Sequence, residues 1–251
     1  MRSIESPLLK RYKDILHAFS TRAGGYSKHP FLGNNLAFHV NDSPHTVNKN
    51  HLHFAKELGY PYERLIRMEQ VHGDAVVIID KNFDLKQIPK CDAIITDLKN
   101  TPLMVMVADC IPVLIYDPVK KVIATVHAGR AGVFSRIVPK TINKIKEKFK
   151  SKPENLLIAL GPSIFQCCYE VGIEIKKEAE KYAYDYAIST KKGRYYLDLN
   201  TIIYRQLQEL GIKEKNIELS QYCTSCNNDI FYSYRGENSD CGRFCGLLML
   251  K

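Results

Sequence analysis

The sequence lacks the features of membrane proteins, of fibrous proteins and of proteins whose domains are joined by flexible linkers. Its longest apolar stretch, residues 103–116, is interrupted by Asp109 and cannot span a bilayer. No internal repeat, low-complexity segment or linker rich in Pro, Gly and Ser divides the chain, so we expect a single domain over residues 1–251. Hydrophobic content of 45% and charged content of 25% match an ordinary globular protein and exclude a disordered chain or a collagen. We therefore expect no membrane partner.

A secretory signal is also missing. The N-terminal stretch MRSIESPLLKRYKDILHAFSTR carries charges throughout and has no apolar core of the kind that a signal peptide needs. We therefore predict a cytoplasmic protein, in which the eight cysteines are free thiols, core residues or metal ligands rather than disulfides. A chain of 251 residues needs neither disulfides nor a metal merely to fold.

The net charge of +9 invites a nucleic-acid interpretation, but no recognition motif supports it. The densest basic run, residues 140–152, places Ile142, Ile145 and Phe149 at helical spacing. Its lysines lie off that apolar face, which predicts an amphipathic helix whose basic face is solvated. Attraction of an anionic partner or substrate is the alternative. No basic motif with interleaved aromatic residues is present. We expect no nucleic-acid partner, and a basic nucleic-acid-binding module is kept only as the non-enzyme alternative.

The hydrophobic pattern places strands and helices in series along the chain. Strands are predicted over residues 17–22, 64–69, 75–79, 93–96, 103–107, 112–116, 122–127, 156–160, 217–219, 230–234 and 244–250. Helices are predicted over residues 43–59, 132–150, 172–186 and 199–210. In the first helix Ser43 is a candidate N-cap and Gly59 a candidate stop. Strands in series with intervening helices favour a mixed α/β sandwich over a TIM barrel or a doubly wound parallel sheet.

Three short segments place a histidine or a cysteine at the end of an apolar strand or in a tight turn. They are QVHG, ADCIP and VHAG, and they contain His72, Cys110 and His127. Side chains at strand ends converge on clefts, and catalytic zinc sites commonly take three ligands from separate elements and keep a fourth position for water. Asp109 is a candidate to orient an imidazole from outside the ligand set.

Two other interpretations of these residues stay open. The histidines can lie at the edge of the core beside an ordinary buried thiol, since free cysteine is often buried. Alternatively, Cys110 and a histidine can form a nucleophile pair, with the cysteine as thiolate and the histidine as base.

The remaining cysteines suggest a rival metal site near the C-terminus. Cys223 and Cys226 form a C-x2-C pair, and Cys241 and Cys245 form a C-x3-C pair at a separation close to that of zinc ribbons. Ordinary thiols are the alternative. Because adjacent cysteines do not easily join one metal, the Cys167-Cys168 pair is interpreted as packing.

A series of ordered segments carries a resemblance that spans residues 17–250. They are STRAGGYS (20–27), NNLA (34–37), QVHG (70–73), CDAIIT (91–96), VADCIP (107–112), VHAG (126–129), LGPSI (160–164), YEVG (169–172), CT (223–224), YSYR (232–235) and GR (242–243). In this order they resemble the FAMIN-like YfiH/YlmD family, formerly described as polyphenol oxidases or laccases. The sequence differs at Arg130-Ala131, where the family usually has Trp-Arg, and Arg235 is followed by Gly236 rather than a second arginine.

The resemblance implies a fold, a metal and a reaction. The implied fold is a single-domain α/β/α-type layered sandwich with mixed sheets flanked by helices, like that of the cytotoxic-necrotizing-factor cysteine hydrolases. The implied cofactor is zinc, held by His72, Cys110 and His127. The implied activity is phosphorolysis of the purine nucleosides inosine, adenosine and guanosine, with adenosine deaminase and methylthioadenosine phosphorylase activities alongside. A Cys–His hydrolase in peptidoglycan-precursor editing is the alternative.

Phosphorolysis requires groups that hold an anionic phosphate beside a sugar. Arginine suits this task because its planar, permanently charged fork binds phosphate in bidentate fashion. Candidates are Arg22, Arg130 and Arg235, and Arg243 also lies within one of the family segments. Asn35 is a candidate for binding ribose or base, although a turn role suits it equally well.

Deamination would need a carboxylate that carries a proton, for which Asp109 is the nearest candidate. The H-x-E…P-C-x-x-C signature of the zinc deaminases is absent. A multicopper phenol oxidase is disfavoured, since the chain has eight histidines and one His-x-His, at His51 and His53. We expect purine nucleoside and phosphate as partners, and a monomer or small homo-oligomer.

Overall fold

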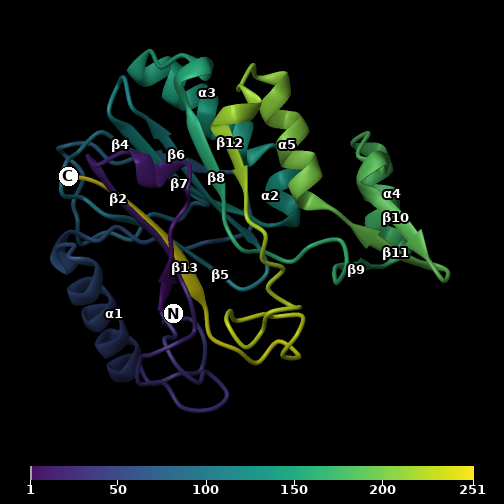
Figure 1. Ribbon diagram of the computed structural model, residues 1–251, viewed down its shortest axis with the longest axis horizontal. Helices are drawn as coiled ribbons and strands as arrows, with labels where there is room; N and C mark the ends of the chain where they lie inside the picture. Colours follow the sequence, from purple (N-terminus) through teal and green to yellow (C-terminus); the bar gives the residue numbers. More distant parts are fainter. Residues whose placement is uncertain (1) are drawn as a thin grey trace.

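Two β-sheets stacked face to face form the centre of the molecule, and helices cover their outer faces (Figure 1). This computed structural model describes residues 2–251. The larger sheet has the strand order β12-β8-β6-β7-β4-β3. Its strands are β3 Val76–Ile78, β4 Ala93–Thr96, β6 Ile111–Asp117, β7 Val122–Ala128, β8 Leu157–Leu160 and β12 Ile217–Leu219. The outer pairs β12/β8 and β3/β4 are parallel and the other pairs are antiparallel, so this sheet is mixed.

The smaller sheet has the strand order β1-β2-β13-β5 and is antiparallel throughout. Its strands are β1 Ser3–Ile4, β2 Ile15–Ser20, β5 Leu103–Val107 and β13 Phe244–Leu250. Helix α1, Pro44–Leu58, covers its outer face through Phe54 and Ala55. The outer face of the larger sheet is covered by α2 Arg130–Phe134, α3 Ile137–Phe149 and α5 Leu199–Glu209.

The apolar runs of the sequence explain these layers. Successive side chains of a strand point to opposite faces of the sheet, so in β4 Ile94 packs between the sheets while Ile95 packs against the helical layer. Since both faces of the larger sheet are covered, β6 and β7 are buried along their whole length.

A small unit extends from one side of this sandwich (Figure 1). It contains a three-stranded sheet of order β10-β11-β9 and helix α4. Their bounds are β9 Glu170–Val171, α4 Ile173–Lys181, β10 Ile188–Lys191 and β11 Arg194–Leu197. No helix within residues 2–251 is long and apolar enough to cross a membrane.

The predicted α/β layered sandwich with flanking helices is confirmed, and of its two stacked sheets the larger is mixed and the smaller is antiparallel. Strands β4, β5, β12 and β13 have the predicted bounds. Helix α1 also lies where it was predicted and ends at Gly59, whose φ of 77° is in the left-handed region that glycine tolerates. Ser43 occupies the N-cap position, but its side chain makes no capping hydrogen bond.

Other predicted elements are wrong. The helix predicted over residues 132–150 is two helices, because Arg136 adopts a left-handed φ of 63° between them. The helix predicted over residues 172–186 ends at Lys181, and the chain continues into the β10–β11 hairpin. Residues 64–69 form single bridges in place of a strand, and residues 230–234 form turns and irregular backbone.

Gly161 offers a test of the packing between the sheets. A Cβ atom at this position would collide with the ring of Phe19, which is buried in the cluster between the sheets. We expect Gly161→Ala to lower the free energy of unfolding by about 1–3 kcal/mol, because overpacking forces side chains out of place. Denaturant unfolding measures the effect. Combined with Phe19→Leu, the loss should be smaller than the sum of the two single losses, and simple additivity would contradict this account.

Candidate active site

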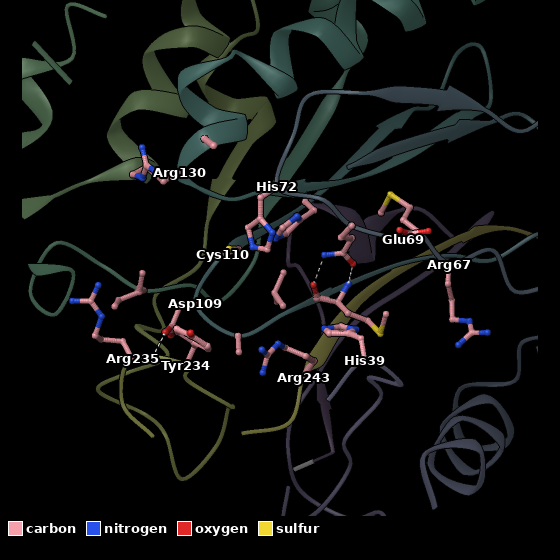
Figure 2. Close-up of a pocket in the computed structure, with 18 of the residues that line it drawn as sticks. His39, Arg67, Glu69, His72, Asp109, Cys110, Arg130, Tyr234, Arg235 and Arg243 are labelled. Carbon is pink, nitrogen blue, oxygen red and sulfur yellow. Dashed lines mark hydrogen bonds between the residues drawn. The ribbon is translucent and has the colours of Figure 1, made fainter. Parts of the chain in front are cut away.

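A cavity of about 980 Å³ opens where strands of the two sheets end. It is lined by most of the residues that were predicted from the sequence to form a functional site (Figure 2). These are His72, Asp109, Cys110, His127, Arg130 and Arg235.

His72, Cys110 and His127 come together at the centre of this cavity. Their nitrogen and sulfur ligand atoms all lie within 4.8 Å of one another. Cys110 occupies the short turn between β5 and β6, and His127 lies near the end of β7, opposite Pro112 of β6. His72 lies in the loop before β3 with a left-handed φ of 58°. The two imidazole rings meet edge to face, with centroids 4.8 Å apart.

Gly129 leaves the space that these three side chains need. A Cβ atom at this position would lie 3.2 Å from Cys110 Sγ and 3.2 Å from His72 Cδ2, which is tighter than ordinary packing. Two imidazoles and a thiolate are donors that suit zinc and several other transition metals. Three such ligands from three elements fit a metal ion that keeps a further position for a substrate or water.

Asp92 is the buried carboxylate that fixes this arrangement. It lies 2.7 Å from Nδ1 of His127. It also accepts hydrogen bonds from the backbone N–H groups of Val71 at 3.3 Å, His72 at 3.0 Å and Gly73 at 2.7 Å. Because Nδ1 of His127 is engaged, Nε2 is the ring nitrogen available to a ligand. This role of Asp92 was not predicted, although an acidic residue directly before the buried β4 was an available signal.

Cys110 and His127 stabilise each other's charged forms. Burial alone would raise the pKa of the Cys110 thiol, but the charge on His127 and hydrogen bonds from His127 and His72 lower it to about 6. Burial likewise opposes the protonation of His127, yet the Cys110 thiolate and Asp92 raise its pKa to about 9. Between these pKa values the metal-free pair is a thiolate and an imidazolium. The thiolate is the form of cysteine that binds metals and attacks electrophiles.

Asp109 lines the cavity but does not orient an imidazole as predicted, since Asp92 does so. Its carboxylate accepts hydrogen bonds from Thr224 Oγ1 at 2.6 Å, Ser233 Oγ at 2.7 Å and the backbone N–H of Arg235 at 2.7 Å. Asp109 therefore anchors the loop of residues 224–235, which supplies one wall of the cavity.

Arginines surround the central trio. Figure 2 shows Arg130 and Arg235 on one side of His72 and Cys110, and Arg67 on the other. Arg130 pairs with Glu178 and Arg235 donates to the carbonyl oxygen of Glu170 at 2.7 Å.

Several wall residues were absent from the sequence-based site. Arg67 stacks over Phe38 with its guanidinium carbon 4.6 Å from the ring centroid, and no family segment contains either residue. The guanidinium carbon of Arg243 lies 5.7 Å from the ring centroid of Tyr234, and that of Arg235 lies 5.5 Å from the ring centroid of Tyr169. Tyr169, Tyr234 and Arg243 belong to family segments, so the signal for them was present.

Two predicted substrate-binding residues are instead part of the scaffold. Arg22 donates to the carbonyl oxygen of Asn228 at 2.5 Å and pairs with Glu237 at 3.0 Å, and it does not line the cavity. Asn35 is fully buried, donating to Asp42 at 2.8 Å and accepting from the backbone N–H of Arg243 at 2.9 Å. The structure therefore does not bring these two predicted residues to the site, because neither side chain lines the cavity.

The predicted tail site is also corrected. Cys223 and Cys226 lie together with Cys167 and Cys168, which were interpreted as packing. Cys241 and Cys245 are buried elsewhere, in two different clusters of the hydrophobic core.

Comparison with known proteins finds relatives along nearly the whole chain. It is 35% identical over 241 residues to a Corynebacterium glutamicum protein named purine nucleoside phosphorylase, and the match covers 96% of each. It is 29% identical over 249 residues to Bacillus subtilis YlmD, which carries the same name, with 95% of this chain and 90% of YlmD covered.

Solved structures show the same fold. The Bacillus licheniformis YfiH structure superposes with a TM-score of 0.89 at 29% identity, covering 94% of this chain and 93% of YfiH. Geobacillus stearothermophilus YlmD gives a TM-score of 0.88 at 26% identity, covering 98% of this chain and 94% of YlmD.

A family model described as multi-copper polyphenol oxidoreductase laccase matches residues 16–251. The resemblance seen in the sequence is thereby confirmed, and the chain belongs to this family together with the YfiH and YlmD proteins.

Proposed function

We propose that this protein is a zinc-dependent purine nucleoside phosphorylase that takes inosine, adenosine or guanosine with phosphate as co-substrate. The observation that carries the proposal is the meeting of the His72–Cys110–His127 donor set with arginine side chains in one cavity. The name purine nucleoside phosphorylase, borne by the relatives from Corynebacterium glutamicum and Bacillus subtilis, supports the same reaction.

The phosphate is assigned to Arg130 and Arg235, which line the cavity next to Tyr169. Arg130 has Glu178 as its ion-pair partner, and Arg235 donates to the carbonyl oxygen of Glu170. A guanidinium carries more N–H donors than these contacts use, so both side chains retain donors for an anion. Their planar forks match the oxygens of phosphate.

In phosphorolysis a phosphate oxygen bonds to the anomeric carbon of ribose while the bond from that carbon to the purine nitrogen breaks. The electron pair of the broken bond leaves with the purine, which takes up a proton. The two arginines offset the charge of the phosphate and hold it beside the sugar. Asp92 keeps His127 in the orientation that presents Nε2 to the cavity. Zinc, when bound by His72, Cys110 and His127, supplies a Lewis acid in this cavity.

Adenosine deamination and methylthioadenosine phosphorolysis are proposed as side activities, because both substrates share the purine and the ribose ring. Asp109 is the proton carrier that the sequence suggested for deamination. Three donors of the 224–235 loop already hold its carboxylate, so we assign it the positioning of that loop instead.

A Cys–His hydrolase acting in peptidoglycan-precursor editing is the second candidate. One observation favours it: Asp92, His127 and Cys110 form a chain in which the carboxylate holds the imidazole and the imidazole faces the thiol. This is the arrangement of a cysteine nucleophile with its base and orienting acid. Zinc separates the candidates, because metal on the thiolate would block a nucleophile but support the phosphorylase.

A copper-dependent polyphenol oxidase remains disfavoured despite the family description. The pair at His51 and His53 does not form a copper site. His51 is buried in the core with Nε2 2.8 Å from the carbonyl oxygen of Leu36, and burial lowers its pKa to about 4. His53 lies at the surface beside Arg2 and Glu57.

The assay that tests the proposal incubates the zinc-loaded protein with inosine, adenosine or guanosine, with and without phosphate. We expect free base and ribose 1-phosphate only when phosphate is present. Cys110→Ala should lower the rate by at least about 100-fold, since a metal ligand is lost. Cys241→Ala, which removes a buried thiol outside the cavity, serves as the control. The proposal fails if no nucleoside yields base, or if base is released equally well without phosphate.

The pKa values of the central pair predict how the metal-free protein reacts with alkylating agents. Below pH about 6 the Cys110 thiol is protonated and unreactive, and above it the thiolate dominates. The alkylation rate of Cys110, taken as the difference between wild type and Cys110→Ala, should rise through about pH 6 and then level off. A rate that keeps climbing towards the ordinary thiol pKa would contradict the thiolate–imidazolium pair.

A further inference from the structure

Four cysteines outside the active-site trio form a second cluster of sulfur atoms. They are Cys167, Cys168, Cys223 and Cys226, and all four sulfurs lie within 4.8 Å of one another. The sulfur of Cys167 is 3.7 Å from those of Cys168, Cys223 and Cys226, and the Cys168 and Cys226 sulfurs are 3.3 Å apart.

The backbone explains how two adjacent cysteines contribute to one cluster. The N–H groups of Cys168 and Tyr169 both donate to the carbonyl oxygen of Phe165, at 3.0 Å each, so the chain turns tightly here. Within this turn the Cys167 and Cys168 sulfurs lie on the same side, 3.7 Å apart. The objection that neighbouring cysteines cannot share a metal therefore does not hold for this conformation.

The second pair is brought to the first by direct backbone pairing. Ser163 and Cys223 form a parallel bridge, and the N–H of Thr224 donates to the carbonyl oxygen of Ser163 at 2.9 Å. The N–H of Asn227 donates to the carbonyl oxygen of Cys223 at 3.0 Å, which folds the C-x2-C segment back on itself. The two segments are more than fifty residues apart in sequence, as the separation of 58 between Cys168 and Cys226 shows.

The size of the cluster matches a tetrahedral metal site. A metal–sulfur distance of about 2.3 Å gives sulfur–sulfur edges of about 3.8 Å in a regular tetrahedron. Four of the six edges, at 3.3 and 3.7 Å, are close to this value, and the other two are no longer than 4.8 Å. A disulfide would need a separation of about 2.05 Å, far shorter than any of them.

The surroundings of the sulfurs affect their ionisation in different ways. Burial raises the pKa of the Cys167 thiol, and the contact with the Cys168 sulfur raises the pKa of Cys226 to about 11, whereas backbone amides favour the thiolate of Cys223. The backbone N–H of Phe165 donates to Cys223 Sγ at 3.4 Å. Although burial by itself would raise the pKa of Cys223, hydrogen bonds from the amides of Phe165 and Cys226 lower it.

We propose that Cys167, Cys168, Cys223 and Cys226 bind a second, structural metal ion of the thiophilic divalent class, such as zinc. Four thiolates complete a tetrahedron and leave no open position, which is the pattern of structural rather than catalytic zinc. The ion fixes the segment that begins at Cys223 and continues into the 224–235 loop. That loop is anchored on Asp109 and carries Arg235 into the active-site cavity.

Metal stoichiometry of the full-length protein tests the proposal independently of enzymatic activity. After loading with zinc, wild type should hold two equivalents, and Cys226→Ser and Cys167→Ser should each hold one. Both of these side chains are exposed, so serine there does not disturb the core. Cys110→Ala should also drop to one, through loss of the other ion. Cys241→Ser, a buried cysteine outside both clusters, should keep two.

Cobalt identifies which site has been lost. In the cobalt-loaded protein the thiolate-to-metal charge-transfer absorption of a four-thiolate site should persist in Cys110→Ala and disappear in Cys226→Ser and Cys167→Ser. Two equivalents of zinc in both serine variants would overturn the proposal, as would a single equivalent in wild type that is lost in Cys110→Ala. Fewer than eight reactive thiols in denatured, chelator-treated wild type would also overturn it, since a disulfide would then occupy the cluster. A failure of the nucleoside assay would leave these outcomes unchanged.

Discussion

The contact between Asp92 and His127 joins the sheet, the loop before β3 and the metal-capable side chains into one unit. A buried carboxylate is costly unless hydrogen bonds satisfy it. Asp92 meets that condition with the His127 ring and the backbone N–H groups of residues 71–73. Although burial opposes its ionisation, these bonds hold the pKa of Asp92 below its usual value, so it stays charged beside His127.

A second aspartate, Asp109, has a corresponding positioning role on the opposite side of the cavity. Asp109 holds the loop of residues 224–235, while Asp92 holds the histidines, and Cys110 lies directly after Asp109 in the chain. The turn between β5 and β6 thus connects the metal-capable half of the site with the half that presents Arg235. The cavity depends on both sheets, because β5 belongs to the smaller sheet and β6 and β7 to the larger.

The sequence predicted best where a residue's environment is set by its immediate neighbours. Apolar runs such as Leu103–Val107 are buried on both faces and were predicted with correct bounds. The β10–β11 hairpin was missed because its strands are only partly buried and carry no such run. The central trio could be predicted from three strand-end segments. The position of Asp92 directly before β4 was visible in the sequence, but its partner was not, because Asp92 meets His127 only when β4 pairs with β7.

Membership of a family segment was also a poor guide to substrate binding where the residue stabilises the fold. Arg22 and Asn35 lie in such segments, yet the structure gives both of them internal partners. The Cys167-Cys168 pair was dismissed on local geometry, and the turn at Phe165 together with a distant C-x2-C segment changes that conclusion. In each case the deciding information is a contact between segments far apart in the chain.

The most direct test of this account is the metal affinity of Asp92→Asn, measured by competition with a chelator. Loss of the carboxylate should weaken binding at the His72–Cys110–His127 site by about 10–100-fold, because His127 is no longer held in its orientation. Asp117→Asn is the matched control, since Asp117 is a buried aspartate that accepts backbone hydrogen bonds outside the cavity. Unchanged affinity in Asp92→Asn, or an equal loss in both variants, would contradict the central place given to Asp92.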